Sequence, residues 1–247
     1  MEHNTDLVIL CGGLGKRLRS IVDDRPKVMS EINGKPFLEI LIKYIKCFGF
    51  KKIILCTGHL GHMIQNYFGN GIKYDIEIVY SQEEVALGTA GAIKNAERII
   101  SSNPFFVLNG DSFTRINFYT LISFHLQNDA DISIPLVKIK RPSRYGTVSI
   151  GDNSRITQFL EKDETCSEGW VNTGVYLLSK KILASIPLNS FFSLEKNILS
   201  DQTNNFRIFG MPVDCKFIDI GTPESYSNLA KNYNDYFEDT FFKSESG

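Results

Sequence analysis

The pattern of apolar and polar residues in the first half of the chain predicts short buried strands that alternate with amphipathic helices. Between the strands, apolar side chains recur at helical spacing from Phe37 to Phe48, where Gly49 ends the helix, and a second helix is predicted from Thr89 to Ile100. Strands that alternate with helices predict a parallel sheet joined by right-handed crossovers. The strands are predicted from apolar runs rich in β-branched or aromatic residues, at 7–11, 53–57, 76–80 and 105–109.

The second half of the chain predicts several strands in quick succession, which we expect to join the sheet in antiparallel fashion. Two more helices are predicted, one over 194–199 and one from Glu224 towards Phe237. No linker or repeat divides the chain, so we expect one α/β domain with a Rossmann-like mixed, mostly parallel sheet and helices on both faces. The strands are predicted at 132–137, 147–150, 156–160 and 171–178.

Composition and charge narrow the class of protein. Hydrophobic residues make up 43% of the chain and charged residues 22%, which is typical of a soluble globular protein. A formal net charge of -1 gives no sign of a nucleic-acid partner or an acidic membrane. The cysteines form no Cys-x-x-Cys pair, and the apolar run near the N-terminus is too short for a signal peptide or a membrane span. We therefore expect a cytoplasmic protein with no nucleic-acid or membrane partner, for which a homo-oligomer stays open.

A glycine-rich segment follows the first predicted strand directly. In Cys11-Gly12-Gly13-Leu14-Gly15-Lys16-Arg17 the absence of Cβ atoms lets backbone N–H groups approach phosphate oxygens. A tight strand-to-helix turn alone explains about half of such glycine patterns. Here Arg17 adds a forked donor, and Lys27, after the rigid Arg25-Pro26 step, adds a second cation. Together they predict a site for a polyphosphate.

This stretch, continued by Asn33-Gly34-Lys35-Pro36, resembles the signature of the sugar-1-phosphate nucleotidyltransferases, although Lys16 stands where the family usually has threonine. The resemblance implies the nucleotidyltransferase (GT-A-like) fold over 1–247, with a nucleotide-binding half over about 1–115 and a sugar-phosphate half over about 116–247. It also implies an enzyme that joins a nucleoside triphosphate to a sugar 1-phosphate and releases pyrophosphate. Further ordered matches are Leu87-Gly88-Thr89-Ala90-Gly91, Asn109-Gly110-Asp111, Tyr145-Gly146, Glu161-Lys162, Asn172-Thr173-Gly174 and Ile218-Asp219-Ile220-Gly221.

The resemblance assigns the candidate site residues in three groups. The implied catalytic residues are Arg17, Lys27, Asp111 and Asp219, of which Asp111 and Asp219 would hold Mg²⁺. The nucleotide-binding candidates are Leu10, Gly12, Gly13, Gly15, Gln82, Glu83, Gly88 and Thr89. The sugar-phosphate candidates are Gly146, Glu161, Lys162, Asn172, Gly174 and Glu195, where Glu195 either binds sugar hydroxyls or is merely a charge at a helix start.

The chemistry expected of such an enzyme explains these residue types. A sugar 1-phosphate, with a second pKa near ~6, is mostly dianionic at neutral pH and needs no general base. The reaction needs two polyanions to be aligned and the leaving pyrophosphate to be neutralised. If the strands before Asp111 and Asp219 both run parallel to the first strand, their carboxylates lie together at the carboxyl edge of the sheet and suit Mg²⁺.

The substrates within the family follow from finer features. Residues 15–22 and 34–39 resemble the D-glycero-α-D-manno-heptose 1-phosphate guanylyltransferases, with mannose-1-phosphate guanylyltransferases and sugar-1-phosphate uridylyltransferases as alternatives. Guanine offers N1–H and N2–H₂ donors, so we expect an acceptor from Glu83 or Glu84, with Gln82 as an amide alternative. Val85-Ala86 stands where these relatives usually carry Glu-Pro, which loosens the turn before Gly88.

Two other classes of function, a non-catalytic nucleotide-binding subunit and a glycosyltransferase, fit the sequence less well. A non-catalytic nucleotide-binding subunit would not need Arg17, Lys27, Asp111 and Asp219 together. A glycosyltransferase that consumes a nucleotide sugar usually carries an Asp-x-Asp motif, whereas Asp111 is followed by Ser112 and Phe113. The sequence therefore favours the nucleotidyltransferase.

Overall fold

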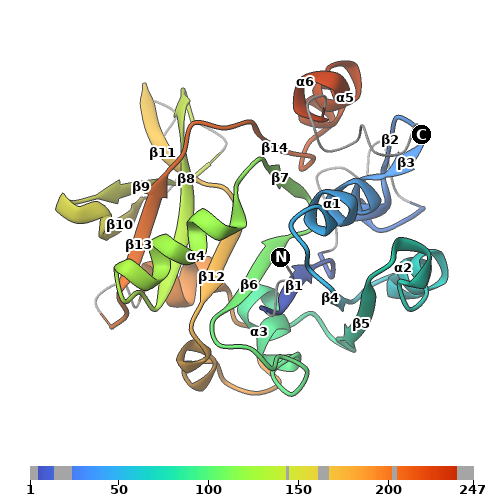
Figure 1. Cartoon of the computed structure of the whole chain (residues 1–247), viewed down its shortest axis with the longest axis horizontal. Coiled ribbons are helices and arrows are strands. Elements are labelled where there is room, and N and C mark those ends of the chain that lie inside the picture. The colour runs from blue at the N-terminus through green and yellow to red at the C-terminus, as the bar shows by residue number, and fades with distance from the viewer. Residues whose placement is uncertain (1–4, 14–23, 143–144, 161–166, 202–204, 238–247) are drawn as a thin grey trace.

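A computed structural model describes residues 5–13, 24–142, 145–160, 167–201 and 205–237. Within them, one ten-stranded sheet runs in the order β10-β9-β11-β8-β12-β6-β1-β4-β5, with β13 paired to β8 (Figure 1). None of the helices in these segments is both long enough and apolar enough to cross a membrane.

The four strands from the first half of the chain are parallel, as predicted. They are β1 (Leu7–Leu10), β4 (Lys52–Thr57), β5 (Glu77–Gln82) and β6 (Phe105–Asn109). In the central strand β1, Leu7 and Ile9 pack into one hydrophobic cluster while Val8 packs into another on the opposite face. Burial on both faces explains the continuous apolar run, and the carboxyl ends of all four strands lie at one edge.

The second half of the chain extends this sheet mainly with antiparallel strands. They are β8 (Ile132–Lys140), β9 (Thr147–Ile150), β10 (Ile156–Leu160), β11 (Glu168–Asn172) and β12 (Val175–Leu178), and β13 (Ile208–Pro212) runs parallel to β8. The single strand predicted over 171–178 was wrong. Gly174, at φ +75°, breaks it into β11 and β12, which both pair with β8 but differ in their other neighbour, β9 for β11 and β6 for β12.

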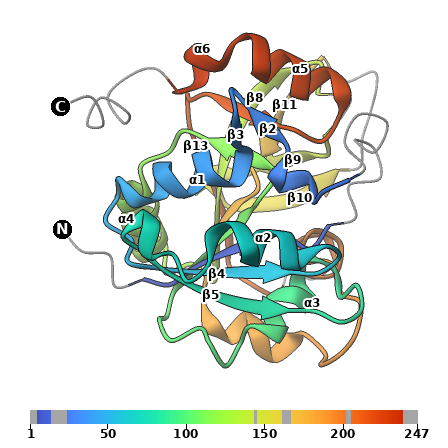
Figure 2. The same cartoon turned by 90° about the vertical axis from the view of Figure 1, so that its right-hand side faces the viewer.

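Helices cover both faces of the sheet, as predicted, and Figure 2 shows α1 and α2 on one side of β4 and β5 with α3 on the other. The α-helices are α1 (Phe37–Lys46), α2 (Gly61–Phe68), α3 (Gly88–Asn95), α4 (Phe118–Gln127), α5 (Pro223–Lys231) and α6 (Tyr233–Phe237). Short 3₁₀ turns span Lys27–Met29, Ile72–Tyr74, Asp152–Ser154 and Lys180–Ser185. The helix predicted over 194–199 is a π-helix, Leu194–Ser200.

Two small two-stranded sheets lie outside the main sheet. The first joins β2 (Glu31–Ile32) to β3 (Lys35–Pro36), just before α1. The second joins β7 (Ser112–Thr114) to β14 (Phe217–Asp219) in antiparallel fashion. This second sheet ties the segment after β6 to a segment about a hundred residues later.

Candidate active site

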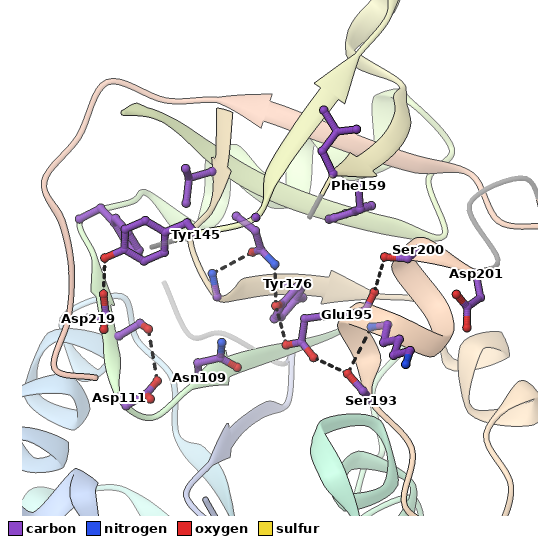
Figure 3. A pocket seen from close by; sticks show the side chains of 18 of the residues that line it. Asn109, Asp111, Tyr145, Phe159, Tyr176, Ser193, Glu195, Ser200, Asp201 and Asp219 are labelled. Carbon is purple, nitrogen blue, oxygen red and sulfur yellow. Dashed lines mark hydrogen bonds between the residues drawn. The ribbon is translucent and has the colours of Figure 1, made fainter. Parts of the chain in front are cut away.

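Two hollows adjoin beyond the carboxyl end of β6. The larger has a volume of about 470 Å³ and the smaller about 180 Å³. They share three lining residues: Lys27, Asn109 and Asp111. In Figure 3 the larger hollow runs from Asp111 and Asp219 at one end to the π-helix at the other.

The two hollows separate the two sets of predicted residues. The smaller hollow is lined by Leu10, Gly13 and Thr89, all proposed for the nucleotide. The larger is lined by Gly146, Asn172, Gly174 and Glu195, all proposed for the sugar phosphate. The candidates that line a hollow are thus divided between the two, with a charged boundary between them. Four other described candidates for the nucleotide line neither hollow: Gly12, Gln82, Glu83 and Gly88.

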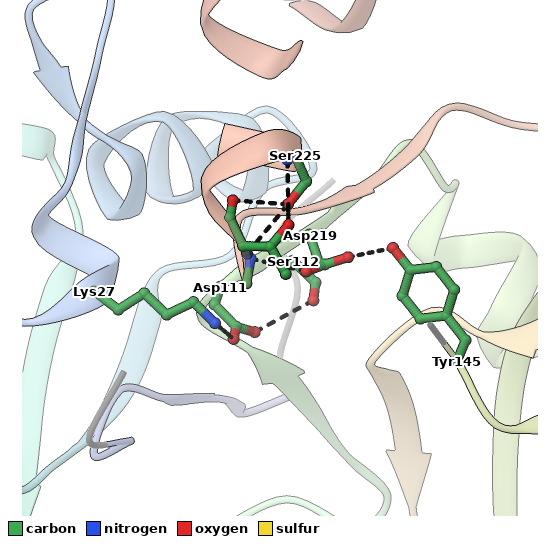
Figure 4. A network of polar contacts seen from close by, with 8 residues as sticks. Lys27, Asp111, Ser112, Tyr145, Asp219 and Ser225 are labelled. Atoms are coloured by element: carbon green, nitrogen blue, oxygen red, sulfur yellow. Dashed lines mark hydrogen bonds and ion pairs between the residues drawn. The ribbon is translucent and has the colours of Figure 1, made fainter. Parts of the chain in front are cut away.

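Lys27 and Asp111 form that boundary. Lys27 opens the 3₁₀ turn after Pro26, and its ammonium makes an ion pair with the carboxylate of Asp111 (Figure 4). The side chains are 13% and 34% exposed, respectively, so both reach the hollows while remaining partly shielded from water. Partial burial strengthens electrostatic interactions relative to bulk water.

Asp219 lies near Asp111, but a different strand pairing from the predicted one positions it there. Its strand β14 is not part of the main sheet but pairs antiparallel with β7, so that Asp219 lies opposite Ser112. The backbone N–H of Ile220 then donates to the carbonyl oxygen of Asp111 at 2.9 Å. The sheet β7–β14, rather than a shared edge of the main sheet, brings the two aspartates together.

The carboxylate of Asp219 is held on both oxygens. Oδ1 accepts from the backbone N–H of Gly221 at 2.8 Å, and Oδ2 accepts from the hydroxyl of Tyr145. A Cβ atom at Gly221 would collide with Oδ1 of Asp219 and lie 3.4 Å from Nζ of Lys27. A larger residue at this position would displace the carboxylate of Asp219, and Lys27 and Asp219 converge there.

The two aspartates supply carboxylate oxygens of the kind that Mg²⁺ binds. The described residues contain no group of three or more His, Cys, Asp or Glu side chains that could hold a metal by themselves. Mg²⁺ does not require such a group, because it commonly binds one or two carboxylates together with waters and substrate phosphates. The ammonium of Lys27 already lies against Asp111 as a positive counter-charge, which indicates that this position suits a cation.

Glu83 lies against the start of the glycine-rich segment. A Cβ atom at Gly12 would be 2.6 Å from Oε1 of Glu83, and one at Gly58 would be 2.7 Å from it. Both glycines leave room for this carboxylate, whose Oε2 accepts from the backbone N–H of Leu87 at 3.2 Å. Burial raises the pKa of Glu83. Gln82 is exposed and accepts instead from Gln65 at 3.4 Å.

The turn at Gly88 is held without the proline that relatives usually carry. Gly88 has φ +73°, and a Cβ atom there would lie 2.8 Å from the carbonyl oxygen of Phe192. That oxygen accepts from the backbone N–H groups of Ala90 at 2.9 Å and Gly91 at 3.0 Å. Phe192 and the Glu83–Leu87 hydrogen bond therefore fix a turn that Val85-Ala86 alone would leave loose.

The larger hollow contains a group of amide and hydroxyl side chains. Asn172 accepts from the backbone N–H of Gly174 at 2.9 Å and donates to the hydroxyl of Tyr176 at 2.8 Å. Gly174 lets Asn109 approach, because a Cβ atom there would be 2.7 Å from Nδ2 of Asn109. The sequence reasoning missed Asn109 and Tyr176 as pocket residues; the position of Asn109 two residues before Asp111 was the available signal.

The π-helix Leu194–Ser200 lines the end of the larger hollow away from Asp111. Its wide turn is seen in the i→i+5 bond from the N–H of Asp201 to the carbonyl of Lys196, at 3.0 Å. In an α-helix, Glu195 and Ser200 would point about 140° apart. The wider winding lets both line the hollow while Leu199 stays buried. Such π segments are rare and often occur at functional sites.

Four of the predicted site residues lie outside the described residues. They are Gly15 and Arg17 in the glycine-rich segment, and Glu161 and Lys162 after β10. Their roles stay predictions.

Comparison with known proteins places the chain in a family. The model of the nucleotidyl transferase family matches residues 7–236, nearly the whole chain. The chain belongs to the nucleotidyl transferase family. The reaction class expected from the sequence is thereby confirmed.

The nucleotidyl transferase resembles curated enzymes over their full length. It is 39% identical to the D-glycero-α-D-manno-heptose 1-phosphate guanylyltransferase of Aneurinibacillus thermoaerophilus, over 94% of this chain and 99% of that one. The enzyme of the same name from Campylobacter jejuni is 38% identical, over 91% of this chain and 98% of that one. The crystal structure of HddC from Yersinia pseudotuberculosis complexed with GMP-PN matches with a TM-score of 0.83 and 34% identity, over 93% of this chain and 99% of that one.

Proposed function

We propose that this nucleotidyl transferase joins GTP to D-glycero-α-D-manno-heptose 1-phosphate, forming a GDP-sugar and pyrophosphate. The observation that carries the proposal is the pair of adjoining hollows that share Lys27, Asn109 and Asp111. A nucleotide in the smaller hollow and a sugar phosphate in the larger would meet at this boundary, where the bond must form.

The reaction needs alignment and charge rather than a base. An oxygen of the sugar phosphate attacks the α-phosphorus, and the bond from that phosphorus to the bridging oxygen of pyrophosphate breaks. Lys27 neutralises charge on the phosphates, and we assign Arg17 to the leaving pyrophosphate. Asp111 and Asp219 would hold Mg²⁺, which when bound screens the charge of the phosphate oxygens.

The guanine preference rests on Glu83. A carboxylate can accept hydrogen bonds from both N1–H and N2–H₂ of guanine, whereas uracil and thymine offer only one donor on that edge. Glu83 lies beside Gly12 and close to the turn at Gly88, where the base is expected. The names of the two guanylyltransferases reported above and of the GMP-PN complex support the same choice.

The heptose preference rests on the length of the larger hollow. Beyond Glu195 it continues along the π-helix to Lys196, Ser200 and Asp201, so polar groups remain available past the position of a hexose ring (Figure 3). An enzyme discriminates strongly when such groups bind a substrate hydroxyl that a competitor lacks. The names of the relatives from Aneurinibacillus and Campylobacter agree with this choice.

The deciding experiment measures kcat/KM by pyrophosphate release for GTP, UTP, CTP and ATP, each with heptose and mannose 1-phosphates. We expect GTP with the heptose phosphate to give the highest value. Asp201→Ala should narrow the heptose-to-mannose ratio without changing the nucleotide preference. A preference for UTP or CTP would refute the assignment of guanine, and a faster reaction with mannose phosphate would make the protein a mannose-1-phosphate guanylyltransferase.

We also propose that the reaction takes place in the cytoplasm. Cys11, Cys56 and Cys215 form no disulfide, which suits a reducing compartment. Fractionation of the source cells, with detection by antibody, would test the location.

A further inference from the structure

We infer that Thr89, on the turn expected to hold the nucleobase, acts through its hydroxyl as a positioning residue for the sugar by way of Glu195. This inference rests on the proposed function for the two hollows but not on the identity of the base or the sugar. It is drawn from a hydrogen-bond chain that crosses from one hollow to the other.

The hydroxyl of Thr89 makes two hydrogen bonds with the start of the π-helix. It donates to Oε2 of Glu195 at 2.7 Å and accepts from the backbone N–H of Leu194 at 2.7 Å. A threonine hydroxyl has one hydrogen to donate, so the hydroxyl of Thr89 has none left to donate to a nucleotide. The residue nevertheless lines the smaller hollow, which places it between the two substrates.

Three hydroxyl groups hold the carboxylate of Glu195. Besides Thr89, the hydroxyl of Ser193 donates to Oε2 at 3.0 Å and that of Tyr176 donates to Oε1 at 3.2 Å (Figure 3). A carboxylate has about four acceptor positions, so Oε1 keeps capacity for a hydroxyl of the sugar. Glu195 lines the larger hollow, where that hydroxyl would lie.

Tyr176 fixes the other oxygen of the Glu195 carboxylate, Oε1. Its side chain is fully buried, and its hydroxyl accepts from Nδ2 of Asn172 at 2.8 Å. Burial, together with the nearby Glu195, raises the pKa of Tyr176 well above its usual value, so the phenol stays a donor. With Tyr176 holding Oε1, the hydroxyls of Thr89 and Ser193 together hold Oε2, and Thr89 makes the shorter of the two bonds.

Loss of this hydroxyl should therefore weaken sugar binding rather than nucleotide binding. Without it, Glu195 loses its shortest hydrogen bond and the N–H of Leu194 loses its acceptor. Removing a hydrogen bond to a charged group corresponds to roughly a 10- to 100-fold change in an equilibrium constant. We expect a change in this range in the KM for the sugar 1-phosphate.

The test compares Thr89→Val, which keeps the shape and loses the hydroxyl, with Thr89→Ser, which keeps the hydroxyl. Kinetics are measured with whichever triphosphate and sugar phosphate the wild type uses fastest, so failure of the GTP and heptose assignments does not affect the outcome. Thr89→Val should raise the KM for the sugar phosphate roughly 10- to 100-fold and change the KM for the triphosphate by less than about threefold. Thr89→Ser should restore both. Thr120→Val, on the exposed side of α4, is the matched control.

A double-mutant cycle then tests the route through Glu195. In a Glu195→Ala background, Thr89→Val should have little further effect on the KM for the sugar phosphate, because the group that it positions is already gone. Full additivity would overturn the inference. A rise in the KM for the triphosphate with that for the sugar phosphate unchanged would also overturn it and make Thr89 a nucleotide contact. Thermal unfolding of each variant shows whether a KM change comes from lost folding, and a Thr89→Val effect that Thr89→Ser does not reverse would count against a role for the hydroxyl.

Discussion

Substituting Lys27, at the boundary of the two hollows, by alanine should lower the catalytic rate far more than the stability of the fold. In the structure its ammonium is paired with Asp111 and lies close to Gly221, beside Asp219. The substitution removes a positive charge from both hollows and leaves the carboxylate of Asp111 without its counter-charge. Substrate phosphates would then meet negative charge where they now meet a cation.

The magnitude follows from the burial of the pair. At about 4 Å and an effective dielectric constant of about 20, an ammonium and a phosphate oxygen attract by about 4 kcal/mol. Loss of a charged contact to the transition state should lower kcat/KM by roughly two to four powers of ten, or about 3–5 kcal/mol. Because the carboxylate of Asp111 is 34% exposed and remains accessible to water, the free energy of unfolding should fall by less than this loss in transition-state binding.

The assay is pyrophosphate release under steady-state conditions, together with urea unfolding of the same preparations. Lys51→Ala is the matched control, since Lys51 is exposed and lines neither of the two hollows. An unchanged rate in Lys27→Ala with intact folding would show that Lys27 is only a surface lysine. A loss of activity that matches a loss of folded protein would equally refute the reasoning.

Three further predictions test the metal, the base and the fold. EDTA should abolish turnover and Mg²⁺ should restore it. Asp111→Asn should lower the rate by several powers of ten while the protein stays folded. Near-normal turnover in that variant would rule out a metal role for Asp111. Because burial raises the pKa of Glu83, its carboxylate should become protonated at a higher pH than an ordinary glutamate as the pH is lowered, and the KM for GTP should rise with this protonation. Glu83→Gln should remove this pH dependence. If the variant keeps it, the dependence belongs to another group. Burial lowers the pKa of His125 from 6.5 to about 4, so the folded protein disfavours the protonated imidazole. The free energy of unfolding should therefore fall by about 3 kcal/mol as the pH is lowered from above 6.5 towards 4, as measured by urea unfolding. His125→Gln should lose this pH dependence, whereas the control His62→Gln, at an exposed residue, should keep it.

The parts of the fold that could be predicted are those where one physical signal dominates. Strand β1 is buried on both faces, so its sequence is apolar without interruption, and α1 is amphipathic and is followed by Gly49. Helix α4 was missed because its apolar residues are largely aromatic or β-branched and do not favour a helix. Its start was nevertheless marked by Asn117, whose side chain accepts from the N–H groups of Tyr119 and Thr120.

Strand β13 was missed for a similar reason, since its residues disfavour the structure that they form. It contains Gly210 and ends at Pro212, both of which argue against a strand in sequence. In the structure Gly210 lies against Leu136 of β8, where a Cβ atom would collide with that side chain. The close approach of two strands that are distant in the chain explains the glycine, and no local pattern carries that information.

The same limit applies to the site. Residue types near strand ends predicted Asp111 and Asp219 as site residues. The pairing of β14, the strand before Asp219, with β7 is not specified by local sequence. The hydrogen bond between Thr89 and Glu195 joins residues 106 positions apart. Its existence depends on how the π-helix packs beside α3, so sequence could assign each residue to a substrate but could not link them.

The origin of the lining residues bears on how sugar specificity changes within the family. All described residues of the smaller hollow come from positions 10–111, which supports the proposal of a nucleotide-binding half over about 1–115. In the larger hollow, only Lys27, Asn109, Asp111 and Ser112 come from that half, and every other lining residue lies at 145 or beyond. Substitutions from residue 145 onward, Asp219 excepted, would therefore alter the larger hollow, which we propose binds the sugar phosphate, while leaving Lys27 and Asp111 in place. Where the nucleotide is unchanged, this division lets one chemical centre serve different sugar phosphates, and Glu195 is the point at which the sugar side remains tied to the nucleotide side through Thr89.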